Sequence, residues 1–209
     1  MNYFLLEKEE RWNVLTHAIG FFIALICVPF LLTTAFQSSV LGGSSVLVFS
    51  LSLLFMLASS SLYHLQISPK AKERFQKLDH IAIFFLIAGT YTPFITFFVE
   101  APLKFYYLGL MWGIAFIGTG IKFFSTGKLK YISTVAYLIM GWMVVFIGEP
   151  IVENLCTAGF TWLITGGVFY SVGTIFYLMK KMKYSHVVWH FFVLLGGLSH
   201  FIAVWYCLI

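Results

Sequence analysis

Residues 14–36 read VLTHAIGFFIALICVPFLLTTAF, a nearly unbroken run of apolar side chains. A helix rises about 1.5 Å per residue, so about 20 such residues cross the roughly 30 Å of hydrocarbon in a bilayer. The run is too long for the apolar core of a signal peptide, and no small-residue cleavage site follows it. It therefore predicts a first transmembrane helix that is retained.

Runs of the same kind recur along the whole chain. Of its 209 residues, 60% are hydrophobic and only 10% are charged. A soluble domain of this size could not bury so much apolar surface in one core. The sequence predicts an all-α membrane protein, a seven-transmembrane helix bundle forming a single domain over residues 1–209. The expected helices are 14–36, 43–65, 79–98, 103–124, 130–148, 157–179 and 186–208.

Short stretches with turn-forming residues separate these runs. Residues 42–45 (GGSS) are expected to form the first turn. Residues 67–77 (ISPKAKERFQK) are expected to form the second, with Pro69 as a helix breaker, and residues 100–102 (EAP) the third. The connections are too short to hold a separate soluble domain.

The basic residues indicate how the bundle lies in the membrane. Of the 13 Lys and Arg residues, all but Lys104 fall at the N-terminus or in the second, fourth and sixth connections. Cytoplasmic loops are enriched in Lys and Arg, so the N-terminus is predicted to be cytoplasmic and the C-terminus outside. The protein is expected in the cell inner (plasma) membrane. This topology accounts for the net charge of +5 without a nucleic-acid partner.

Four polar side chains fall at the predicted cytoplasmic ends of three helices. His64 lies at the end of the second helix, Asp79 opens the third, and His186 and His190 lie in the first turns of the seventh. His186 and His190 are i and i+4, so they share a helix face about 6 Å apart along the axis. Segments distant in sequence thus bring ligand-type side chains to one depth.

These side chains suit a metal site. Two imidazoles at this spacing can bind one ion, and a third from another helix would give three protein ligands, the pattern of catalytic zinc. His64, His186 and His190 are therefore candidate zinc ligands. Asp79 is a candidate base for a water on the metal, and Ser60 could orient His64 or stabilise charge on a substrate carbonyl. Ordinary packing is the alternative, because polar groups are tolerated near the membrane interface.

The other histidines carry different expectations. His200 follows His186 by 14 residues, about 21 Å further along the helix, so it cannot join the same ligand shell. It is expected to be a buried, hydrogen-bonded histidine. His80 points about 100° away from Asp79 and is expected around the site or at the lipid interface. His17 is a candidate partner of a ligand histidine.

Four motifs are informative in combination. ERWNVLTH (10–17) has the spacing E-x2-N-x2-T-H, SSLYH (60–64) has S-x3-H, and SHVVWH (185–190) has H-x3-H. With LDHIAIFFLIAGTYTPF (78–94), they resemble the signatures of the hemolysin III family, the bacterial branch of the progestin and adipoQ receptor (PAQR) family. The likeness covers essentially the whole chain.

The resemblance implies a seven-helix bundle with its N-terminus inside. It implies a zinc ion held by His64, His186 and His190, with Asp79 bonded to a water on the zinc near the cytoplasmic side. It also implies kinship with a proposed superfamily of membrane hydrolases that includes alkaline ceramidases, which favours hydrolysis of a lipid amide. The name of the branch comes from haemolytic, pore-forming activity reported for members.

Three functions stay open at this point. The first is a zinc-dependent hydrolase of a lipid amide or ester, with ceramidase-like chemistry. The second is a pore-forming, cytolytic membrane protein with structural zinc, although the sequence shows no ring of charges that would line a channel. The third is a non-catalytic sensor or regulator of membrane lipid composition. The first and third make a membrane lipid the expected substrate or ligand.

Overall fold

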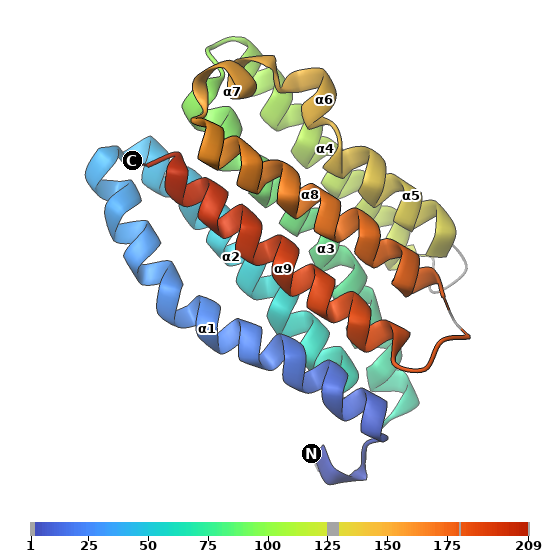
Figure 1. Ribbon diagram of the computed structural model, residues 1–209. Coiled ribbons are helices and arrows are strands. Elements are labelled where there is room, and N and C mark those ends of the chain that lie inside the picture. Colours follow the sequence, from blue (N-terminus) through green and yellow to red (C-terminus); the bar gives the residue numbers. More distant parts are fainter. Residues whose placement is uncertain (1–2, 125–129, 180, 209) are drawn as a thin grey trace.

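The computed structural model describes residues 3–124, 130–179 and 181–208, and every regular element in those ranges is helical. Six of the described helices are long and apolar enough to cross a membrane. They are α1 (Lys8–Ser38), α2 (Val40–His64), α3 (Pro69–Phe98), α4 (Leu103–Phe124), α8 (Thr157–Leu178) and α9 (Ser185–Tyr206) (Figure 1). The predicted fold class, an all-α membrane protein, is confirmed.

The remaining elements are short. They are η1 (Tyr3–Leu5), α5 (Lys130–Gly141), α6 (Val144–Ile147) and α7 (Glu149–Asn154). The expected fifth helix, 130–148, is therefore divided into α5 and α6, and α7 was not predicted. The count of seven membrane spans stays a prediction.

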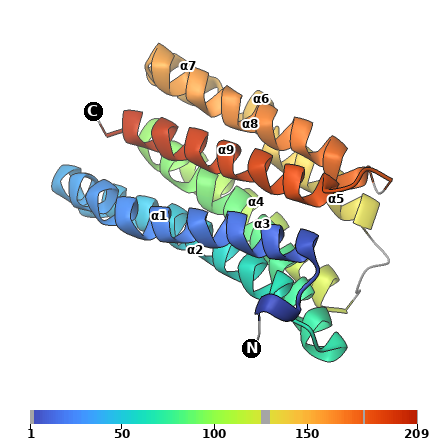
Figure 2. The same ribbon diagram turned by 60° about the horizontal axis from the view of Figure 1, so that its bottom comes forward.

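The long helices form a bundle that α9 closes. α2 packs against α1 and α3, α3 against α4, and α9 against both α8 and α1. Figures 1 and 2 both show α9 between α1 and α8. Contacts of α3 with α9 and of α5 with α8 are few. Loose packing between these elements leaves room for an internal cavity.

Apolar side chains lie on both the inside and the outside of this bundle. Phe49, Phe94 and Met111 are fully buried in its core. On α1, by contrast, Phe22 and Phe30 are more than 60% exposed. A membrane protein can expose such side chains on its outer surface because the lipid tails around it are equally apolar.

The first connection differs from the prediction. Residues 42–45 lie inside α2, and the turn is at Ser39, whose Oγ accepts a hydrogen bond of 2.9 Å from the Gly42 amide. A Cβ at Gly43 would lie 2.2 Å from the Phe36 ring of α1. These glycines therefore serve the close approach of two helices rather than a turn.

The second connection is also shorter than predicted. α3 begins at Pro69, so most of residues 67–77 are helical. Proline is well tolerated in the first turn of a helix, where its missing N–H has no intrahelical acceptor. The Lys, Ala, Glu and Arg residues that follow are good helix formers. The charged stretch extends α3 beyond its apolar part.

The break between α5 and α6 falls at Trp142 and Met143. Tyr91 of α3 bridges it, because its hydroxyl donates to the Gly141 carbonyl and accepts from the Val144 amide, both at 2.7 Å. Backbone groups freed inside a membrane protein need such partners. The side chain of one helix thus stabilises the break in another.

The predicted cytoplasmic helix ends meet at one end of the bundle. Ion pairs and hydrogen bonds join the start of α1 to the end of α2 and to the starts of α3 and α9. Two of the basic residues behind the topology, Lys128 and Lys180, lie outside the described residues. The orientation, N-terminus inside and C-terminus outside, stays a prediction.

Candidate metal centre

Three histidines from two helices converge at this end of the bundle. His64 is the last residue of α2, and His186 and His190 lie in the first two turns of α9. The Nε2 atoms of His64 and His186 are 3.2 Å apart, and the three candidate ligand atoms all lie within 4.8 Å of one another. His64 and His190 are only 3% and 1% exposed. The three predicted ligands are therefore brought together in a group that could hold a metal ion.

A carboxylate fixes the orientation of His64. Its Nδ1 lies 2.6 Å from Oε2 of Glu10, and the other oxygen of Glu10 forms an ion pair with Lys72. Because a carboxylate accepts hydrogen bonds, Nδ1 carries the proton and Nε2 is left with its lone pair. Metal-binding histidines usually donate their second N–H in this way.

His190 is oriented by the first helix. Its Nδ1 lies 3.2 Å from the carbonyl oxygen of Asn13 and 3.1 Å from Oγ1 of Thr16. A carbonyl can only accept, so Nδ1 of His190 donates and Nε2 is again free to bind an ion. His17 stacks on the His190 ring, with centroids 3.8 Å apart. The prediction of His17 as a partner of a ligand histidine agrees with this contact.

The group fits the requirements of zinc. Two nitrogens bound to tetrahedral zinc at about 2.0–2.1 Å lie about 3.3 Å apart, close to the separation of the His64 and His186 Nε2 atoms. The other pairs of candidate ligand atoms are at most 4.8 Å apart, about 1.5 Å more than the nitrogen–nitrogen distance expected at zinc. Rotation of the imidazole rings can close this difference. Imidazole nitrogens suit zinc, and three of them leave a coordination position open.

Asp79 and Ser60 lie beside the three histidines. Ser60 is buried, and its side chain interacts with the carboxylate of Asp79, which is half-buried. Asp79 does not belong to the group of three histidines whose ligand atoms lie close enough together to hold one ion. It lines the same cavity as His186 and His190. Asp79 and Ser60 therefore lie next to the histidine group, and their predicted roles stay predictions.

Two cavities adjoin the histidine group. A polar cavity of about 220 Å³ is lined by Tyr63, Gln76, Asp79, His80, Lys122, Tyr177 and His186. An inner cavity is lined mainly by residues of α3, α5, α8 and α9, and its lining is mostly apolar. Asp79, His80, Tyr177 and His186 line both. His80 is therefore a cavity residue next to the centre, one of the two positions expected for it.

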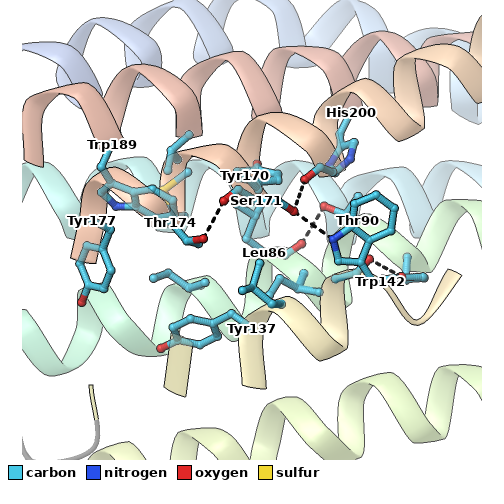
Figure 3. Close-up of a pocket in the computed structure, with 18 of the residues that line it drawn as sticks. Leu86, Thr90, Tyr137, Trp142, Tyr170, Ser171, Thr174, Tyr177, Trp189 and His200 are labelled. Carbon is cyan, nitrogen blue, oxygen red and sulfur yellow. Dashed lines mark hydrogen bonds between the residues drawn. The ribbon is translucent and has the colours of Figure 1, made fainter. Parts of the chain in front are cut away.

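The inner cavity runs along the bundle from the histidine group toward the far end of α9 (Figure 3). Its volume is about 120 Å³, whereas one water needs only about 10–15 Å³. Tyr177 and Trp189 lie at one end, and Trp142 and His200 at the other. His200 is buried, and its Nε2 donates to the Leu163 carbonyl at 3.2 Å. The expectation of a buried, hydrogen-bonded histidine is confirmed.

Comparison with known proteins identifies the family of this fold and site. Residues 6–201 match the family model described as Haemolysin-III related. The chain belongs to the hemolysin III family. It is 39% identical to the Hemolysin-3 homolog of Bacillus subtilis (strain 168), covering 96% of this chain and 95% of that protein. It is 38% identical to the Hemolysin-3 of Bacillus cereus, covering 94% and 90%.

The hemolysin III chain also has more distant relatives. It is 26% identical to the Monocyte to macrophage differentiation factor of Homo sapiens, over 94% of this chain and 83% of that protein. This is a PAQR-type relative, as the sequence motifs implied. The resemblance inferred from those motifs is therefore confirmed.

Two contributors to this hemolysin III centre were not predicted. Glu10 and Thr16 both belong to the motif ERWNVLTH, but no role was assigned to either. Glu10, Asn13 and His17 are three and four residues apart, a spacing that places them on one helix face. That face was visible in the sequence, but nothing in the sequence showed that it packs on His64 and His190.

Proposed function

We propose that this protein is a zinc-dependent hydrolase of a lipid amide or ester. The observation that carries the proposal is the convergence of three imidazoles beside a carboxylate, where a polar and an apolar cavity share lining residues. Each of the two buried imidazoles has its proton on Nδ1 and a lone pair on Nε2. When bound, zinc would polarise a carbonyl and lower the pKa of a water to about 7.

The reaction assigns a task to Asp79. As water attacks the carbonyl carbon, a carboxylate oxygen of Asp79 takes the proton of the water and later gives it to the leaving nitrogen or oxygen. The bond from the carbonyl carbon to water forms, and the amide or ester bond breaks. Ser60, whose side chain interacts with Asp79, would donate a hydrogen bond to this carboxylate and so orient it for the proton transfer.

The two cavities suggest how a lipid would lie. An acyl chain would occupy the inner cavity, where apolar side chains dominate, and the head group would occupy the polar cavity. The scissile carbonyl would then lie at the metal centre between them. We place the protein in the plasma membrane with this centre on the cytoplasmic side, in line with the charge asymmetry of the sequence.

Hydrolysis of a fluorescent ceramide or acyl ester by the purified protein tests this function. Activity should disappear on chelation and return with zinc. Asp79→Asn should lower kcat by about a hundredfold to ten-thousandfold, as expected for loss of a general base, while the protein keeps its metal. Glu73→Gln, an exposed carboxylate on the same helix, is the matched control and should keep full activity. An Asp79→Asn variant with unchanged kcat would contradict the proposed role.

A pore is the second candidate, favoured by the name Hemolysin-3 of the Bacillus cereus relative. In that case wild-type protein should release dye from liposomes, and His186→Ala/His190→Ala should release it equally well. Leakage that requires the three histidines, or no leakage, would count against a pore with structural zinc. A lipid that co-purifies unchanged and tolerates Asp79→Asn would instead indicate a sensor.

A further inference from the structure

Lys122 is a buried lysine in the polar cavity. It lies in the last turn of α4, and only 3% of its surface is exposed. Among the described residues, no carboxylate lies within 4.0 Å of its ammonium, and no hydrogen bond to an acceptor is formed. A buried ammonium is costly unless a charged or polar group compensates it. The cavity it lines is where a compensating group can enter.

Other side chains around Lys122 can also donate hydrogen bonds. Gln76 and Tyr63 line the same cavity, and Nε2 of Gln76 donates to the Tyr63 hydroxyl at 3.3 Å. The amide keeps a second N–H and the hydroxyl keeps its own proton. Asp79 is the one carboxylate of the lining, and it interacts with Ser60 and His64. Beside Asp79, the lining therefore combines the Lys122 cation with two neutral donors, Gln76 and Tyr63.

We propose that Lys122 forms the anion-binding subsite of the metal centre and holds the phosphate or other anionic head group of the lipid. Phosphate oxygens accept several hydrogen bonds and pair readily with an ammonium. Asp79 and His186 line both cavities, so a lipid whose chain lies in the inner cavity brings its head group to the Lys122 side. The inference rests on the proposed function only in that a lipid enters the site; it does not need turnover.

Binding of matched ligands tests the subsite. Purified protein in nonionic detergent is titrated calorimetrically with short-chain phosphatidic acid, with the diacylglycerol of the same chains, and with inorganic phosphate. Wild type should prefer the phosphatidic acid by about tenfold, the effect of one charge-assisted hydrogen bond. Lys122→Gln should abolish the preference and Lys122→Arg should keep it. Inorganic phosphate that binds as tightly, with the same dependence on Lys122, would identify a free anion as the ligand of the subsite.

Lys70→Gln is the matched control, since Lys70 is an exposed lysine in the first turn of α3 and does not line the polar cavity. It removes one positive charge and should leave the preference intact, which separates the subsite from general attraction to a basic surface. Equal binding of the two lipids by wild type, or a preference retained in Lys122→Gln, would overturn the proposal.

Two further points keep the test decisive. If Lys122→Gln does not fold, the rate at which a chemical reagent acetylates Lys122 in the wild-type protein is measured instead. Bound phosphatidic acid should slow this acetylation, whereas diacylglycerol should not. Equal acetylation rates with the two lipids would overturn the proposal. The hydrolase proposal is judged separately, because a protein that shows the Lys122-dependent preference but cleaves no lipid would contradict only the hydrolase.

Discussion

Glu10 connects the metal centre to the first helix at the level of single atoms. Its carboxylate holds Nδ1 of His64 and pairs with Lys72 at the same time. Loss of an outer partner of a metal-binding histidine typically lowers metal affinity by about ten- to a hundredfold. We expect Glu10→Gln to weaken zinc binding to this extent, measured by competition with a chelating dye. Glu7→Gln, an exposed residue whose side chain makes no cap hydrogen bond, should bind zinc like wild type. Equal affinities in all three proteins would contradict the role of Glu10.

Single residues also show how far the sequence predicts the site. His186 and His190 were placed together by helix periodicity alone, because i and i+4 share a face in any helix. His64 joined them through a depth argument based on charge and hydropathy. The role of Glu10 depends on which face of α1 turns toward α2, and this is decided by packing between helices. The buried state of Lys122 follows from packing too, since its sequence position suggests only a charged helix end.

At the scale of elements, the interrupted fifth segment depends on Tyr91. Tyr91→Phe removes the hydroxyl that bonds both Gly141 and Val144, and it leaves two backbone groups without that partner. Each buried group left unsatisfied costs about 1–3 kcal/mol. We expect a lower unfolding temperature in detergent. Tyr106→Phe, at a tyrosine that is 69% exposed, should unfold at the wild-type temperature. A Tyr91→Phe variant as stable as wild type would show that the break needs no such bridge.

The elements were predicted best where the membrane itself dictates them. Apolar runs of membrane length predicted the ends of α2, α4, α8 and α9 to within three residues. The helices α1 and α3 begin six and ten residues earlier than predicted, because polar and charged residues extend their first turns. The errors arose where local signals have two physical meanings. Glycine at 42 and 43 serves turns and also close helix packing, and proline at 69 both breaks and begins helices. The break at Trp142 has no local signal, because a tyrosine from α3 compensates it.

For the molecule as a whole, the central feature is the position of the histidine group next to two unlike cavities. The polar cavity contains Lys122, and the apolar cavity extends along the bundle toward His200. An amphiphilic lipid can place its head group in the polar cavity and its acyl chain in the apolar cavity at the same time. Its carbonyl group would then lie next to His186 and Asp79. The proposed hydrolase depends on the histidines holding a metal ion, whereas the anion-binding subsite at Lys122 requires only that a lipid enters the polar cavity.

The most direct test is therefore metal analysis of the purified protein by mass spectrometry. Wild type, prepared without added chelator, should carry about one zinc per chain, as a site with three protein ligands predicts. His186→Ala/His190→Ala should carry almost none, and His200→Ala should keep the wild-type content because His200 is about 15 Å from His190 along α9. Wild-type protein without stoichiometric metal, or a double variant that retains it, would contradict the account.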